Sequence, residues 1–321
     1  MLAHRLLFGS LMIALLLGLF YLDDRLDELS LEGTVLAAWF GRDFLPAGLL
    51  MLGLFLAVII LVARELCEIF HAKGIGVSWS LVAVSGVSGL LIMYGTPQDT
   101  PARYAIAIMA TVMFAIFMLA LLRYSWAHAR TEGAVIVAAA TMLAFLYLGV
   151  LPGLLIGIRR YHSAWIVLGV ILTVKSCDIG AFFTGRAIGR HRLIPWLSPG
   201  KTWEGLLGGL VTAGVVAGLL VWLNNTFEIA GIYLTDPDTG ERTYHDHRYP
   251  VFASMLAGVI LGAVGQLGDL TASLFKRDAG IKDSGRSIPG FGGLLDVIDS
   301  PIVVAPIAYW MLVLAAQTAS G

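Results

Sequence analysis

The strongest constraint on this chain comes from its long apolar runs, each about as long as a membrane-spanning helix. A helix needs about 20 mostly apolar residues to cross the hydrocarbon core of a bilayer. Nine runs meet this requirement, at 5–22, 44–63, 77–94, 103–122, 133–151, 163–184, 205–223, 250–275 and 301–317. The sequence therefore predicts an all-α, polytopic integral membrane protein with about nine transmembrane helices.

The composition excludes a soluble enzyme and argues against a nucleic-acid binder. Of the 321 residues, 58% are apolar and 13% are charged, whereas an ordinary soluble domain has about 25% charged residues. The 21 basic and 22 acidic side chains nearly cancel, so the chain lacks the broad positive field of a dedicated nucleic-acid binder. The first run ends in Tyr21-Leu22-Asp23-Asp24 without a small-residue cleavage pattern, so we interpret it as a retained span and not as a signal peptide.

Basic residues divide unevenly between the two sides of such a protein. Thirteen fall at the N-terminus and in the loops after spans two, four, six and eight: Arg5, Arg64, Lys73, Arg123, Arg130, Arg186, Arg190, Arg192, Lys201, Lys276, Arg277, Lys282 and Arg286. Seven fall on the other side: Arg25, Arg42, Arg103, Arg159, Arg160, Arg242 and Arg248. By the positive-inside rule, the side with thirteen faces the cytoplasm.

Two acidic clusters fall on the opposite, external side, and we expect their loops to be solvated connectors. The first cluster follows span one and consists of Asp23, Asp24, Asp27, Glu28, Glu32 and Asp43. The second follows span seven and consists of Asp236, Asp238, Glu241 and Asp246.

The chain shows no internal repeat or low-complexity tract. We therefore predict one helical membrane domain over 1–321, with scaffold spans in 1–160 and with catalytic spans and motif loops in 161–321. Cys67 and Cys177 lie beside or inside apolar runs, which predicts small core residues and no disulfide or thiolate metal site. Some glycines recur four residues apart, as helix-packing contacts often do: Gly149, Gly153, Gly157, Gly258 and Gly262.

Charged and polar residues inside the apolar runs mark candidate functional positions, because they are costly in a membrane. Lys175 and Asp178 lie in the sixth run, three residues apart and so on one helix face. A buried structural pair is an equally good interpretation of these two. Gln266 and Asp269 lie in the eighth run.

Asp269 begins a polar stripe that leads out of the eighth run. Ser273 and Lys276 follow at four and seven residues, on the same helical face. The loop at 273–300 then combines glycines, four basic residues and the carboxylates Asp296 and Asp299. Glycines let backbone amides approach an anion, basic side chains supply positive charge, and carboxylates bind Mg²⁺. These residue types together could bind a polyphosphate and its metal ion. The alternative interpretation is an ordinary basic connector whose aspartates cap the next helix.

A second segment on the same side, at 185–209, repeats this pattern. It carries Arg186, Arg190, Arg192 and Lys201 ahead of Thr202 and Glu204. Its Gly-Lys-Thr is not a P-loop, because no glycine stands five residues before Gly200 and no strand precedes it.

These motifs resemble those of the phosphatidate cytidylyltransferases, also called CDP-diacylglycerol synthases. The resemblance is strong over about 165–300 and includes SPGKTWEG at 198–205 and the Gly-Asp-Leu that ends at Leu270. The long fixed-spacing motif is matched by Ser273, Lys276, Arg277, Lys282, Asp283, Pro289, Gly290, Gly292, Gly293, Asp296 and Asp299. Phe291, Val297 and Gly200 replace the family's usual histidine, arginine and lysine.

The resemblance implies transfer of a cytidylyl group from CTP to phosphatidate, with Mg²⁺ and a possible second cation as cofactors. It implies metal ligation by Asp269, Asp296 and Asp299. The catalytic candidates are Asp269, Lys276, Arg277, Asp283, Asp296 and Asp299. The substrate-binding candidates are Ser273, Lys282, Lys201, Thr202, Glu204 and Asp178. The three replacements imply altered triphosphate contacts, with a catalytically dead homologue as the alternative.

Other functions stay open at the level of sequence. A synthase acting on an isoprenoid lipid, or a CTP-dependent kinase of a polyprenol or phytol, would share much of this chemistry. A transporter would use Lys175, Asp178 and Asp269 as an ion relay. The expected partners are CTP, phosphatidate and the lipid bilayer, with no nucleic acid, and a homodimer is one open assembly. We expect the site to face the cytoplasm, at the inner membrane in a bacterium.

Overall fold

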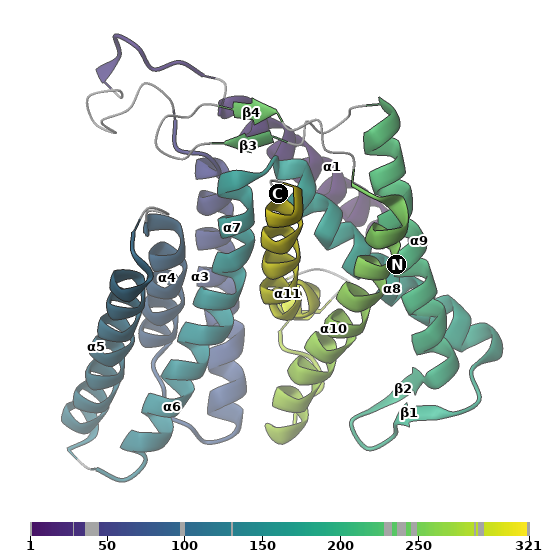
Figure 1. Ribbon diagram of the computed structural model, residues 1–321. Coiled ribbons are helices and arrows are strands. Elements are labelled where there is room, and N and C mark those ends of the chain that lie inside the picture. The colour runs from purple at the N-terminus through teal and green to yellow at the C-terminus, as the bar shows by residue number, and fades with distance from the viewer. Residues whose placement is uncertain are drawn as a thin grey trace. The chain divides into compact units, whose positions relative to one another are not determined.

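The computed structural model confirms an all-α integral membrane protein. It describes residues 2–27, 29–35, 45–96, 100–129, 131–227, 233–235, 242–244, 249–285, 287 and 292–319. The helices are α1 (Leu2–Leu26), α3 (Leu49–Ala72), α4 (Trp79–Gly95), α5 (Ala102–His128), α6 (Ala134–Ala144), the π-helix η1 (Phe145–Val150), α7 (Leu151–Tyr161), α8 (Ala164–Ile188), α9 (Trp203–Phe227), α10 (Val251–Asp278) and α11 (Leu295–Ala319) (Figure 1). Every one of the nine predicted runs therefore contains a helix.

Seven helical stretches of the described chain are long and apolar enough to cross a membrane. They are Leu49–Ala72, Ala102–His128, Ala134–Tyr161, Ala164–Ile188, Trp203–Phe227, Val251–Asp278 and Leu295–Ala315. Helix α4 is apolar but has only 17 residues. Neither α4 nor α1 is among the seven candidate membrane-spanning helices. The predicted count of nine crossings stays a prediction.

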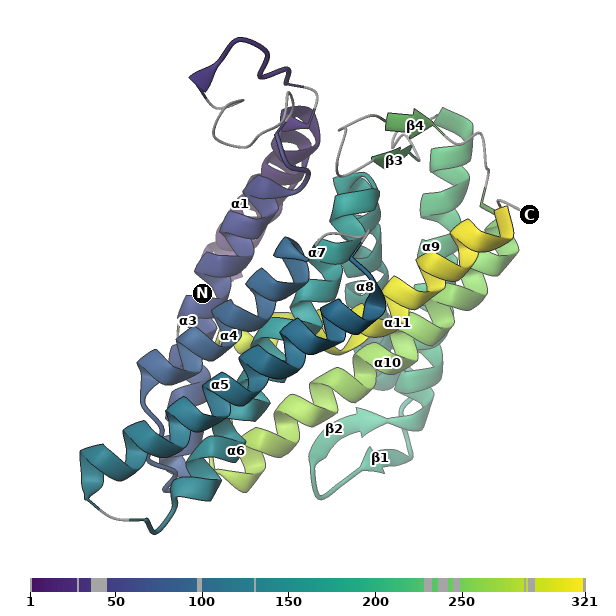
Figure 2. The same ribbon diagram turned by 60° about the vertical axis from the view of Figure 1, so that its left-hand side comes forward.

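The few strands form two short antiparallel hairpins. Strands β1 (Arg192–Ile194) and β2 (Ser198–Thr202) pair between α8 and α9 and are seen at the lower right of Figure 1. Strands β3 (Tyr233–Thr235) and β4 (Arg242–Tyr244) pair between α9 and α10. Figure 2 shows the same elements after a turn of 60°.

The chain divides into two compact units that interleave along the sequence. Unit 1 comprises Met1–Gly9, Leu52–Leu154 and Ala272–Ile298, and unit 2 comprises Ser10–Met51, Leu155–Thr271 and Asp299–Gly321. In unit 1, α4 packs on η1 and α6, and α5 packs on α6. In unit 2, α8 and α9 pack along each other and both contact β2. The separation into scaffold spans and catalytic spans stays a prediction.

The glycines predicted as packing contacts do lie where helices meet. A Cβ on Gly149 would lie 2.6 Å from the carbonyl oxygen of Gly86, and one on Gly258 would lie 2.6 Å from that of Ala213. Such close backbone approach requires small residues. The two cysteines are free and buried, as predicted.

The prediction that the acidic residues after span one are solvated is wrong for two aspartates. Asp23 and Asp27 are buried in unit 2, and both carboxylates pair with the fully buried Arg159 at 2.5 Å. Asp23 also accepts a hydrogen bond from the Met51 amide at 2.9 Å. The two carboxylates can be buried because the Arg159 guanidinium has several N–H donors and a positive charge to pair with them. Six acidic residues of the two predicted connectors lie outside the described residues: Glu28, Asp43, Asp236, Asp238, Glu241 and Asp246.

Candidate functional site

A cavity of about 510 Å³ lies within unit 2, between α8, the β1–β2 hairpin, the start of α9 and α10. Its size is within the usual range for a small-molecule site. Its charged and amide-bearing lining residues are Asp178, Arg186, Arg192, Lys201, Gln266 and Asp269. The cavity therefore brings Asp178 of α8 and Gln266 and Asp269 of α10 together with basic residues of the segment at 185–209.

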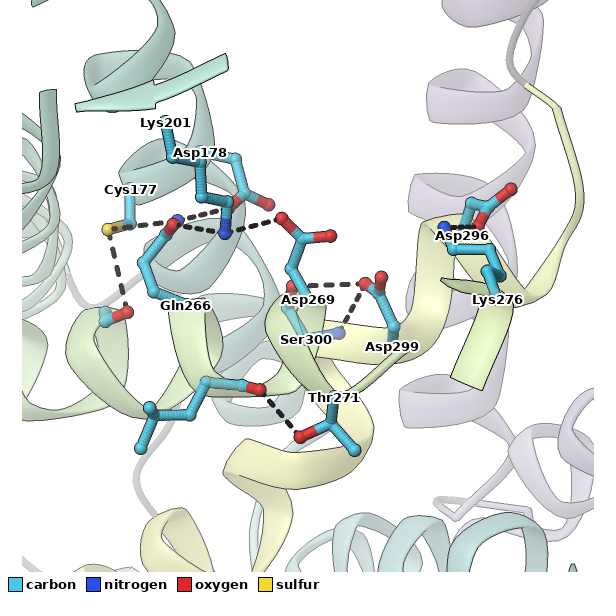
Figure 3. Close-up of polar contacts among 12 residues, drawn as sticks. Cys177, Asp178, Lys201, Gln266, Asp269, Thr271, Lys276, Asp296, Asp299 and Ser300 are labelled. Atoms are coloured by element: carbon cyan, nitrogen blue, oxygen red, sulfur yellow. Dashed lines mark hydrogen bonds and ion pairs between the residues drawn. The ribbon is translucent and has the colours of Figure 1, made fainter. Parts of the chain in front are cut away.

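Four of these side chains form a continuous chain of contacts (Figure 3). The Lys201 amine contacts an Asp269 carboxylate oxygen at 2.6 Å and donates to the Gln266 side-chain oxygen at 2.9 Å. Gln266 in turn donates through its amide nitrogen to Asp178 at 2.7 Å. Lys201 is thus held at the cavity between two residues of α10.

Asp178 also makes the pair that the helix spacing predicts. The Lys175 amine lies 3.3 Å from its second carboxylate oxygen, and both side chains are about one-third exposed at 30% and 34%. Because Gln266 links Asp178 to Lys201, the pair belongs to the polar network of the cavity and is not an isolated structural contact.

The sequence around the hairpin explains how Lys201 is presented. Glu204, in the first turn of α9, accepts hydrogen bonds from the backbone amides of Arg190 and His191 and contacts His191 Nδ1 at 2.6 Å. The Thr202 hydroxyl accepts a hydrogen bond from the Gly205 amide at 3.1 Å, as a residue before a helix often does. Thr202 lines the cavity, whereas Glu204 fixes the turn beside it.

Asp299 lies on α11 in unit 2 and is 2% exposed. Its carboxylate accepts hydrogen bonds from the Ser300 amide at 2.6 Å and the Ser300 hydroxyl at 3.1 Å. It lies within electrostatic range of Asp269, where α10 and α11 pack so closely that a Cβ on Gly268 would be 2.8 Å from the Asp299 carbonyl oxygen. Two neighbouring carboxylates repel each other, and a bound cation would relieve that repulsion.

This pair of carboxylates fits the way in which Mg²⁺ is bound by many nucleotide-dependent enzymes. Such an ion is held by one or two carboxylates together with substrate phosphates and water. Within the described part of the chain, no three His, Cys, Asp or Glu side chains form a metal-binding group. Asp296, the third predicted ligand, belongs to unit 1, so its sharing of an ion with Asp269 and Asp299 stays a prediction.

The predicted residues of unit 1 centre on Asp296, at the start of α11. The Lys276 amine contacts one Asp296 oxygen at 2.6 Å, and both side chains are mostly buried. The other oxygen accepts hydrogen bonds from the amides of Ser284 and Gly293 at 3.3 and 3.2 Å. Lys276 and Asp296, which are 20 residues apart in sequence, are thus brought together.

The remaining candidates of this segment are less enclosed. Ser273 is half-buried on α10, and Arg277, Lys282 and Asp283 are exposed. Of the three replaced family positions, Val297 is half-buried on α11, and a Cβ on Gly200 would meet no atom within 4 Å. Phe291 lies outside the described residues, as do Arg286, Pro289 and Gly290.

Glu65 is a functional candidate that the sequence motifs do not indicate. This residue of α3 is 3% exposed and binds the motif loop through several hydrogen bonds. The signal for it is a carboxylate next to a long apolar run, but the predicted span ends at residue 63 and so excludes Glu65. The sequence marks Gln266 as an intramembrane polar residue, but its contacts depend on how α8, α10 and the hairpin pack.

Comparison with known proteins identifies clear relatives. A sequence model described as "Cytidylyltransferase family" matches residues 30–315. The "Phosphatidate cytidylyltransferase" of Haemophilus influenzae is 40% identical over 146 residues, which are 46% of this chain and 45% of that protein. The "Uncharacterized protein YnbB" of Escherichia coli is 38% identical over 150 residues, which are 47% of this chain and 43% of that protein.

A longer match is found in Bacillus subtilis. Its "Phosphatidate cytidylyltransferase" is 33% identical over 243 residues, covering 73% of this chain and 80% of that protein. Most of the other matched stretches span about half the length of the relatives concerned.

Proposed function

Because the chain belongs to the cytidylyltransferase family, we propose that it transfers a cytidylyl group from CTP to phosphatidate, forming CDP-diacylglycerol and pyrophosphate. The observation that carries this proposal is the cavity of unit 2, which brings three cationic side chains beside two carboxylates. Cations suit the phosphates of both substrates, and carboxylates suit the accompanying metal.

The proposed reaction is an in-line displacement at the α-phosphorus of CTP. An oxygen of the lipid phosphate forms the new P–O bond as the bond to the β-phosphate oxygen breaks and pyrophosphate leaves. The attacking oxygen is already anionic, so a general base is scarcely needed. The protein must act mainly by holding the two anions in line and by balancing their charge.

The residues of the cavity suit these tasks. Lys201, Arg186 and Arg192 supply positive charge for phosphate oxygens, and the contact with Asp269 keeps the Lys201 amine in place. Asp269 and Asp299 would hold Mg²⁺, with Asp296 as the predicted third ligand, and a bound Mg²⁺ would neutralise charge on the phosphates. Lys276, Arg277 and Lys282 of unit 1 are the further phosphate-binding candidates.

The location of the substrates supports a site at the cytoplasmic membrane face. CTP is a cytoplasmic solute and phosphatidate is a bilayer lipid, and both motif segments lie on the side with the excess of basic residues. Nine crossings with the N-terminus inside, an inner-membrane location in a bacterium and assembly as a homodimer complete the proposal.

The function is tested with purified protein, cytosine-labelled CTP and phosphatidate, with and without Mg²⁺. We expect a lipid-extractable cytidine product and equimolar pyrophosphate that depend on Mg²⁺. Release of CDP would instead indicate a CTP-dependent lipid kinase, and a lack of CTP turnover would favour a transporter or an inactive homologue.

An aspartate variant tests the assignment of the site. Asp269→Asn removes a carboxylate charge from the cavity and should lower kcat by about a hundredfold or more. Asp278→Asn is the matched control, because Asp278 is also a lysine-paired aspartate of α10 but is 62% exposed. Near wild-type activity of Asp269→Asn would contradict the proposed metal site.

A further inference from the structure

Glu65 of α3 is a buried carboxylate that binds the motif loop from another part of unit 1. One of its oxygens accepts hydrogen bonds from the Ser284 hydroxyl at 3.1 Å and the Leu295 amide at 2.8 Å. The other accepts from the Leu294 amide at 2.8 Å and from the Ser287 hydroxyl. All four contacts are donated to Glu65, as is expected of a carboxylate, which only accepts hydrogen bonds.

These contacts join Ser284 to the start of α11. Ser284 lies near the loop's beginning, ten residues before Leu294, and Leu295 is the first residue of α11. The first amides of a helix have no partner within it, and a negative charge near them is favourable. Glu65 therefore supplies to α11 a helix cap that comes from a residue 230 positions away in sequence.

Two glycines of the loop leave room for this approach. A Cβ on Gly285 would lie 3.1 Å from the Glu65 side chain. A Cβ on Gly293 would lie 2.5 Å from a Glu65 oxygen and would overlap the Ser284 hydroxyl. The absence of a side chain at Gly293 thus lets Ser284 and Glu65 come together, which gives a physical reason for part of the Gly-Gly motif.

Asp296 is bound by Ser284 and by Gly293, the residue before Leu294. Its carboxylate accepts hydrogen bonds from Ser284 and Gly293 and contacts the Lys276 amine. Ser284 therefore contacts both carboxylates, through its hydroxyl to Glu65 and its amide to Asp296. Displacing the loop would displace the donors that orient Asp296.

We propose that Glu65 is a positioning residue of the transfer reaction, which anchors Ser284 and the start of α11 and so fixes the Asp296 carboxylate against Lys276. The inference rests on the proposed function, in which Asp296 is the predicted third metal ligand and Lys276 is a phosphate-binding candidate. Glu65 does not contact the substrates in this proposal and affects the reaction only by holding the loop residues that orient Asp296.

The test compares Glu65→Gln with Glu68→Gln in the full-length protein. The amide of glutamine keeps the size of the side chain but turns two N–H donors toward a group of donors, so the loop should be released. Glu68 is an exposed glutamate one turn along the same helix and provides the matched control. For Glu65→Gln we expect kcat to fall at least about tenfold, with the KM for phosphatidate within about twofold of wild type. Hydrogen exchange should rise at the amides of 284–296, and Glu68→Gln should match wild type in all three measurements.

Gly293→Ala tests the same contact from the loop side if Glu65→Gln fails to fold. It leaves the charge of Glu65 in place but prevents close approach, and it should show the same loss of kcat and the same rise in exchange. A folded variant that keeps the kcat of Glu68→Gln, or whose loss lies wholly in KM, overturns the positioning role. Absence of product from wild type itself would mark failure of the proposed function instead.

Discussion

At the scale of single residues, Arg159 shows how a charge is accommodated deep inside this protein. It is fully buried, and its guanidinium pairs with Asp23 and Asp27 and donates to the carbonyl oxygens of Asp23 and His162. A buried charge is tolerated only when it is paired and hydrogen-bonded. The loop aspartates after the first helix thus serve the interior of unit 2, although their sequence context is that of a solvated connector.

His162 follows Arg159 in this cluster and predicts a pH dependence of stability. It is 7% exposed, its Nδ1 is without a hydrogen-bond partner among the described residues, and burial lowers its pKa to about 4. The unfolded chain, with a histidine pKa near 6.5, binds a proton at a pH where the folded protein does not. Stability should therefore fall as the pH drops from about 6.5 toward 4, by about 2 kcal/mol between pH 7 and pH 5.

The measurement is the denaturation midpoint in detergent at pH 7 and pH 5. His162→Phe keeps a buried ring but cannot titrate, so its midpoint should change less over this range than that of wild type. Equal changes in the two proteins would show that other groups carry the pH dependence.

At the scale of elements, unit 1 depends on close contact between α4 and the π-helix η1. A Cβ on Gly89 would lie 2.9 Å from both the Phe145 carbonyl oxygen and the Gly149 Cα. The wider turn of a π-helix often marks a local adjustment within a longer helix, and here it lies directly against the glycines of α4. The glycine spacing in sequence indicates packing, but it does not indicate the partner helix.

This contact predicts a difference between two glycine substitutions in α4. Gly89→Ala should lower the free energy of unfolding by about 1–3 kcal/mol, because the methyl group must push two backbones apart. Gly95→Ala should be neutral or slightly stabilising, because a Cβ there would meet no atom within 4 Å. Thermal unfolding of the two variants in the same detergent gives the comparison, and equal midpoints would contradict the role of the close contact.

At the scale of the whole molecule, the number of crossings decides which loops share a side of the membrane. Three predicted spans separate Glu32 from Glu132, and the middle one is the 17-residue α4. Both glutamates are exposed. If α4 crosses the bilayer, these two positions lie on opposite sides.

Cysteine labelling tests this arrangement. Because Cys67 and Cys177 are buried, a membrane-impermeant maleimide should react little with the parent protein in intact cells. We expect Glu32→Cys to react from outside and Glu132→Cys to react only after permeabilisation. Labelling of both from the same side would show that α4 does not cross, and the reverse pattern would contradict the predicted orientation.

The sequence by itself determined the membrane-spanning character, the positions of the helices and the motif that marks the family. These properties depend on hydropathy and spacing along a single segment, so they can be recognised without knowing what the segment touches. The tertiary structure alone decided that Lys201 contacts Asp269, that Asp23 and Asp27 neutralise Arg159, and that Glu65 binds a serine 219 residues away. Such contacts arise from helix packing, which brings distant segments together and leaves no periodic signal in either of them.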